Sequence, residues 1–157
     1  MKRILVACIG NIFLGDDGFG VEVSRRLAQR PLPDGVRVID FGIRGLDLTY
    51  ALLEGWDAAI FVDAAPRGGQ PGTLYVLDPQ ADASAPSAIE PHGMDPMKVL
   101  ALAGNLGGTP KVLRVIGCEP ASAGDFEMGL SPEVQAAVDP AVALVEDLVE
   151  KLGGAHA

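Results

Sequence analysis

Apolar positions along the chain follow two repeating patterns, short continuous runs and a helical spacing. Short runs of Val, Ile, Leu and Ala bounded by Gly, Pro or Asp are typical of strands that are buried on both faces of a sheet. Such runs occur at residues 3–9, 36–41, 58–64, 73–77 and 111–118. The run at 73–77 lies between two proline-containing turns, which favours a position at the edge of the sheet.

Helical spacing occupies the segments between these runs. Phe19, Val23 and Leu27 recur every four positions, which predicts a helix over residues 19–30 that Pro31 ends. Two shorter helices are predicted at residues 46–53 and 96–106.

The C-terminal segment carries two helix-start signals in succession. Ser131 and Asp139 are capping residues, and each precedes a proline, so two abutting helices are predicted there. Strands that alternate with helices indicate a three-layer α/β/α sandwich around a twisted, mostly parallel five-stranded sheet. No internal repeat or linker divides residues 1–157, so one domain is expected.

Composition and charge exclude several classes of function. With 48% hydrophobic and 21% charged residues, the chain is typical of a globular protein. A net charge of −9 argues against a nucleic-acid partner. No apolar run approaches the ~20 residues that span a bilayer. The first run is interrupted by Gly10 and then by Asp16 and Asp17, so a buried strand is favoured over a signal peptide, and we expect a cytoplasmic protein.

In sheets of this class, sites form beyond the carboxyl ends of the strands. Four segments lie there: residues 10–18, the loop 42–45, Asp63, and the turn at 118–120. The first loop lacks the G-x-G-x-x-G motif and carries two carboxylates where a pyrophosphate would bind, so dinucleotide binding is disfavoured.

Carboxylates gathered at strand ends indicate a cation site. Asp17 and Asp63 could lie close together, and two ionised acids in one pocket repel unless a metal or a proton neutralises them. His92 is one of two histidines, and an imidazole with two carboxylates suits zinc or nickel.

Each candidate also has a simpler interpretation. Asp16 and Asp17 could cap the helix that begins near Phe19, and we assign Asp16 that role. His92 could be an ordinary loop histidine. Two further groups lie near the same strand ends. Cys118, like Cys8, is expected to be a reduced, buried thiol, and Glu119 is a further acid beside the site.

Several ordered blocks of the sequence together resemble the hydrogenase maturation proteases, the endopeptidases that trim the C-terminus of the hydrogenase large subunit. The blocks are Ile-Leu-Val at 4–6, Gly-Asn-Ile-Phe-Leu-Gly-Asp-Asp-Gly-Phe-Gly at 10–20, Asp-Phe-Gly-Ile-Arg-Gly-Leu-Asp-Leu at 40–48, Phe-Val-Asp-Ala at 61–64, Pro-Gly-Thr at 71–73, Pro-His-Gly at 91–93, Gly-Cys-Glu-Pro at 117–120 and Gly-Leu-Ser-Pro at 129–132.

The resemblance implies a twisted sheet between helices and a specific set of site residues. It assigns Asp17, where many members carry Glu, together with Asp63 and His92, as metal ligands, with the two acids also catalytic. Members often have Asp-Gly-Gly-Thr where this chain has Asp-Phe-Gly-Ile at 40–43. The adjoining loop, Gly42, Ile43, Arg44 and Gly45, is thought to face the substrate, so this change would mark which hydrogenase is served.

The resulting hypothesis is an endopeptidase that uses nickel in the precursor of the nickel–iron hydrogenase large subunit as a checkpoint. Zinc or cadmium could occupy the same site in vitro, and a monomer is expected. Either the metal activates the carbonyl or the attacking water, or an aspartate acts as general base. The alternatives are a non-catalytic nickel chaperone that uses the same ligands, and a phosphoacceptor receiver domain, which would want a lysine near residues 118–120.

Overall fold

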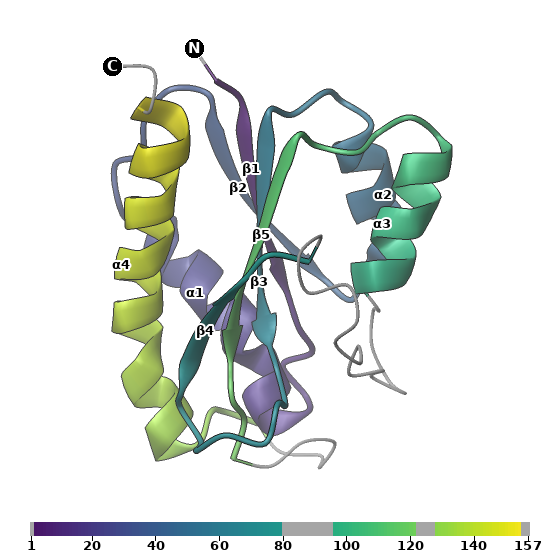
Figure 1. Ribbon diagram of the computed structural model, residues 1–157. Helices are drawn as coiled ribbons and strands as arrows, with labels where there is room; N and C mark the ends of the chain where they lie inside the picture. Colours follow the sequence, from purple (N-terminus) through teal and green to yellow (C-terminus); the bar gives the residue numbers. More distant parts are fainter. Residues whose placement is uncertain (1, 80–95, 122–127, 155–157) are drawn as a thin grey trace.

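The computed structural model describes residues 2–79, 96–121 and 128–154. A five-stranded sheet lies between two helical layers, which confirms the predicted three-layer α/β/α sandwich (Figure 1). The strands are β1 (Ile4–Ile9), β2 (Val36–Gly42), β3 (Ala58–Ala64), β4 (Leu74–Leu77) and β5 (Val112–Cys118). The helices are η1 (Gly15–Gly18), α1 (Phe19–Leu27), α2 (Gly45–Leu52), α3 (Pro96–Asn105) and α4 (Pro132–Gly154). Helix α1 ends three residues before the predicted boundary.

The strand order is β2-β1-β3-β5-β4, and every pairing is parallel except that of β4 with β5. The short β4 therefore lies at an edge, as predicted. Strand β1 lies between β2 and β3 and is covered on both faces, which explains its unbroken apolar sequence.

Side-chain alternation along the strands divides the core between the two faces. In β1, Ile4, Val6 and Cys8 pack on the α1 and α4 side, whereas Leu5 and Ala7 pack on the α2 and α3 side. The same alternation in β3 sends Val62 to the α1 side and Phe61 to the other. The carboxyl ends of β1 and β3 are thus fixed from both faces.

Helix α4 corrects one prediction, because it is a single helix with Pro140 inside it. A proline in a helix interior lacks an amide donor and costs about 3 kcal/mol. Here the helix continues because one apolar face, on both sides of the proline, is buried against α1 and the sheet. That face consists of Val134, Ala137, Val138, Ala141, Val142, Val145 and Val149. The burial of this continuous face outweighs the lost backbone hydrogen bond.

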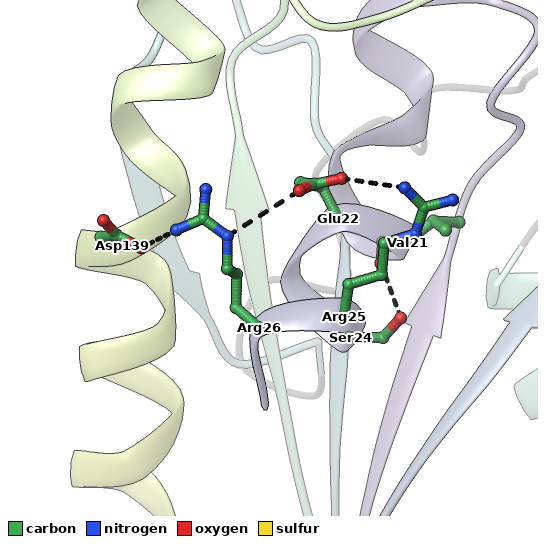
Figure 2. Close-up of polar contacts among 6 residues, drawn as sticks. All are labelled: Val21, Glu22, Ser24, Arg25, Arg26 and Asp139. Carbon is green, nitrogen blue, oxygen red and sulfur yellow. Dashed lines mark hydrogen bonds and ion pairs between the residues drawn. The ribbon is translucent and has the colours of Figure 1, made fainter. Parts of the chain in front are cut away.

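Asp139, predicted to cap a second helix, instead forms an ion pair across the layer (Figure 2). Its partner Arg26, on α1, also lies 3.8 Å from Glu22, which in turn lies 3.6 Å from Arg25. These side chains are largely exposed, so each pair contributes under about 1 kcal/mol. The apolar face described above therefore holds α4 on α1.

Gly20 allows the first turn of α1 to lie directly on the ends of two strands. A Cβ at this position would lie 2.2 Å from the Ile9 carbonyl oxygen and 2.5 Å from that of Val62. The loop that precedes α1, residues 10–18, which we term the acidic loop, is thereby held against β1 and β3. Among the described residues, none of the helices is long and apolar enough to span a membrane.

Candidate active site

The loop between β1 and α1 folds tightly around Asp17. The Asn11 amide donates to the Asp17 carboxylate over 2.9 Å, and the Asn11 side-chain oxygen accepts from the Phe13 amide over 2.9 Å. The Leu14 amide donates to the Asn11 carbonyl over 3.1 Å, which closes the turn. A Cβ on Gly10 would lie 2.1 Å from the Asp17 carbonyl oxygen, so only glycine allows this approach. Sequence reasoning had not singled out Asn11, although an Asn in a loop after a strand is a known turn former.

Asp17 is 7% exposed, and its burial raises the pKa of its carboxyl above the usual value. The hydrogen bond from the Asn11 amide lowers that pKa but only partly offsets the burial. A carboxylate in this position is poorly hydrated, so a proton or a cation stabilises it. Asp17 thus has the electrostatic character of an acid–base group or a metal ligand.

Asp63 is the penultimate residue of β3 and is likewise buried, with 9% of its surface exposed. Its Oδ1 accepts the amide hydrogen of Ala64 over 2.8 Å. In the parallel pairing of β1 with β3, Cys8 lies opposite Val62, so Asp63 is level with Ile9, the residue just before the acidic loop. Helix η1, which carries Asp17, packs against β3. Both predicted acids therefore lie at the same end of the sheet, beyond or near the carboxyl ends of its parallel strands.

His92 lies outside the described residues. Within residues 2–79, 96–121 and 128–154, no three His, Cys, Asp or Glu side chains gather closely enough to hold a metal ion. The described chain supplies two of the three predicted ligands, and the complete metal site remains a prediction.

The loop from Gly42 to Gly45 lies beside the acidic loop. The Gly10 amide donates to the Gly42 carbonyl over 3.0 Å, which joins the two loops at their first residues. Gly42 has a φ of +56°, a conformation that glycine adopts readily. The Arg44 guanidinium folds back onto the carbonyls of Phe41 (3.1 Å) and Asp40 (2.5 Å). Ile43, by contrast, is 51% exposed and is available to a partner.

Asp16 does not cap helix α1 as we had predicted. Gly18 occupies the N-cap position, and no side chain caps the helix. Asp16 is 2% exposed, and its carboxylate accepts from the Ala121 amide (2.8 Å), the Ser131 amide (2.7 Å) and the Ser131 hydroxyl (2.9 Å). It therefore joins the acidic loop to the segment after β5 and to the start of α4. Ala121 and Ser131 are both more than 100 positions away in the chain, so no local sequence pattern indicated these contacts.

The two cysteines are free, buried thiols, as predicted. Burial raises the pKa of Cys118 to about 12, and the nearby charges of Asp16 and Glu119 add to the effect. Burial also raises the pKa of Cys8. Both groups are protonated at neutral pH, so neither is an activated nucleophile.

Glu119 has a structural role in the loop that follows β3. Its Oε1 accepts from the Tyr75 hydroxyl (2.7 Å) and from the amides of Arg67 and Gly69 (both 2.9 Å). Burial alone would raise the pKa of Glu119, but these hydrogen bonds outweigh it and the pKa lies below its usual value. The carboxylate is committed to this loop, which leaves Asp17 and Asp63 as the candidate acids of the site.

Comparison with known proteins identifies relatives of the whole fold. A family model described as hydrogenase maturation protease matches residues 21–148. The hydrogenase 2 maturation protease of Escherichia coli is 36% identical over 143 residues, which cover 89% of this chain and 86% of that protein. A putative hydrogenase maturation protease of Methanocaldococcus jannaschii is 34% identical over 154 residues, which cover 96% of this chain and 98% of that protein.

The solved structures point to the same family. The hydrogenase maturating endopeptidase HybD of Escherichia coli superposes with a TM-score of 0.85 at 34% identity, covering 96% of this chain and 94% of that one. The [NiFe] hydrogenase maturation protease HycI of Thermococcus kodakarensis has a TM-score of 0.77 at 27% identity, covering 95% and 93%. The chain therefore belongs to the hydrogenase maturation protease family and is a peptidase.

Proposed function

We propose that this protein is the endopeptidase that removes a C-terminal extension from the nickel-loaded precursor of a nickel–iron hydrogenase large subunit. The observation that supports this most directly is the pair of buried acids, Asp17 and Asp63, at one edge of the sheet. The family and the names of the relatives, which include hydrogenase maturation proteases, supply the class of reaction and of substrate.

In this proposal nickel belongs to the substrate and marks a precursor that is ready to be cut. Asp17, Asp63 and His92 contact that nickel, and a precursor without it docks unproductively. Two carboxylates and an imidazole are a donor set that suits a first-row metal and leaves positions open for the precursor's own ligands. Zinc or cadmium can take the same place in vitro.

Peptide hydrolysis at this site needs an activated water and an activated carbonyl. Water adds to the scissile carbonyl carbon, the C–N bond breaks, and the leaving amine takes up a proton. The bound metal can polarise the carbonyl or lower the pKa of the water. Alternatively, one of the two aspartates accepts the proton of the water and passes it to the amine. Asp17 suits this role because burial raises its pKa toward the working range of a general base.

The deciding experiment measures the intact mass of a purified large-subunit precursor after incubation with this protein, with and without nickel. We expect loss of a C-terminal peptide from the nickel-loaded precursor only. Asp17→Asn, Asp63→Asn and His92→Ala should each abolish the loss. Asp34→Asn, a change at an exposed acid, is the matched control and should cleave normally.

Two results would contradict parts of the proposal. Cleavage of nickel-free precursor at an equal rate would show that nickel is not a checkpoint, whereas the proposed protease activity would stand. An unchanged precursor mass, with binding retained, would instead establish the non-catalytic nickel chaperone.

A further inference from the structure

Helix α2 (Gly45–Leu52) is apolar on two opposite faces. Its inner face, with Leu48 and Leu52, is 0–1% exposed and packs in the core. On its outer face Leu46 and Tyr50 are each 60% exposed. They are four positions apart and so lie on one side of the helix. Together with Ile43 (51% exposed), just before the helix, they form what we term the docking strip. An exposed apolar face opposite a buried one is typical of a helix that another surface covers.

The docking strip begins at the candidate active site. Ile43 follows Gly42, whose carbonyl accepts the hydrogen bond from Gly10 that joins this loop to the acidic loop. Since α2 follows the carboxyl end of β2, the helix leads away from that end of the sheet, beside α3 (Figure 1). On the acidic loop Phe13 is 54% exposed. Exposed apolar side chains therefore occur on both of the joined loops beside the site.

The charges around the strip restrict what can cover it. The two charged residues interleaved with it, Arg44 and Asp47, pair with each other over 3.3 Å. The strip therefore carries no net charge, although the chain as a whole carries −9. A second copy of the chain would carry the same −9, and mutual repulsion disfavours it as the occupant. An uncharged, apolar polypeptide surface fits best.

We propose that the docking strip binds an apolar surface of the precursor protein away from the peptide bond that is cut. This inference rests on the proposed function, because it takes the hydrogenase precursor as the partner. Contact at the strip holds the body of the precursor against α2 while its C-terminal segment enters the site at Asp17 and Asp63. These contacts are the same before and during peptide hydrolysis. The binding energy gained at the strip therefore lowers KM and leaves kcat unchanged.

The test compares the double variant Leu46→Ser/Tyr50→Ser with a matched control at the C-terminal end of α3 (Pro96–Asn105), where Leu106 directly follows the helix. The control, Leu102→Ser/Leu106→Ser, has the same four-residue spacing and exposures of 44% and 58%. It lies at the end of α3 that is remote from the carboxyl edge of the sheet. All four side chains are exposed, so both variants should keep the wild-type unfolding midpoint.

With nickel-loaded precursor, the strip variant should raise KM roughly tenfold or more, which corresponds to lost contacts worth about 1.4 kcal/mol or more, and should leave kcat within about twofold. The control should change neither. An unchanged KM in the strip variant, with normal cleavage by the wild type, would overturn the docking strip and leave the proposed function intact.

A direct binding measurement separates the two proposals. If the wild type leaves the precursor uncut, the proposed function fails, and the Kd of the precursor for wild type and strip variant still reports on docking. Equal Kd values would overturn the strip. A wild-type dimer in analytical ultracentrifugation that Leu46→Ser/Tyr50→Ser converts to a monomer would assign the strip to a second copy and also overturn it.

Discussion

Asp16 and Ser131, 115 positions apart in the chain, are joined by two hydrogen bonds. The carboxylate accepts from both the amide and the hydroxyl of Ser131, whose own carbonyl accepts the amide hydrogen of Gln135 in the first turn of α4. Asp16 is also the immediate neighbour of Asp17. The same buried carboxylate thus fixes the acidic loop and anchors the start of the longest helix.

Replacing Asp16 should therefore destabilise the whole domain. Asp16→Ala leaves the part-buried amides of Ala121 and Ser131 without their acceptor and empties a buried position, and we expect the free energy of unfolding to fall by roughly 3 kcal/mol. Ser131→Ala removes only the hydroxyl donor and should cost about 1 kcal/mol. Asp139→Asn, at a side chain that is 78% exposed, is the control and should stay within about 0.5 kcal/mol of wild type. Chemical denaturation gives all three values, and equal losses for Asp16→Ala and Asp139→Asn would refute the anchor.

Asp17→Asn should stabilise the free protein at neutral pH while it abolishes activity. Burial raises the pKa of Asp17 in the folded state, so the favourable contribution of this group exists below its usual pKa of 3.8 and is lost as the pH rises through the raised value. At neutral pH the buried, ionised carboxylate of Asp17 lowers the free energy of unfolding. The neutral amide of Asn has nearly the same shape and does not carry this cost. Unfolding free energies measured from pH 3 to 8 should show a gain for Asp17→Asn at neutral pH that disappears below about 3.8. Asp34→Asn, at an exposed site, should show no such gain, and a loss for Asp17→Asn at neutral pH would contradict the argument.

The contribution of Glu119 to the free energy of unfolding should depend on pH in the opposite direction. Its pKa is lowered in the folded state, so its contribution to stability is present above the usual value of 4.5 and is lost as the pH falls through the lowered one. Glu119→Gln should therefore lower the unfolding free energy at neutral pH and bring variant and wild type together in acid. Tyr75→Phe, which removes one of the donors to that carboxylate, should lose a smaller part of the same contribution. A Glu119→Gln variant whose deficit persists unchanged in acid would show that packing, not charge, is responsible.

Features of the fold that depend on local pattern were predictable from the sequence. Strand β1 and the first five residues of β3 contain no polar residue and are therefore recognisable as buried strands, and Asp63 stands out as the acid near the end of β3. The rule that sites form at the carboxyl ends of strands then brings Asp63 to the edge where the acidic loop begins. Asp17, in contrast, was distinguished from Asp16 by family resemblance, since spacing alone allows either acid to cap a helix.

Features that depend on contacts between distant segments were not predictable. The partners of Asp16 come from beyond β5, and Glu119 binds amides in the loop after β3, so neither role has a local signal. The same limit explains the error at Pro140. A capping residue followed by proline is a sound signal for a helix start, but the apolar face that continues across it belongs to tertiary packing, which overrides local preference.

Pro140→Ala should stabilise the protein. The proline costs α4 about 3 kcal/mol relative to alanine, and its substitution loses roughly 0.4–1 kcal/mol because the unfolded chain becomes more flexible. We expect a net gain of about 2–2.6 kcal/mol and a Tm higher by roughly 4–10 °C. Pro132→Ala is the matched control, because proline is tolerated in the first helical position and its removal should bring no gain. Thermal and chemical denaturation of both variants decide the matter: if Pro140→Ala is no more stable than Pro132→Ala, the packing of α4 must depend on a distortion at Pro140 that alanine fails to maintain.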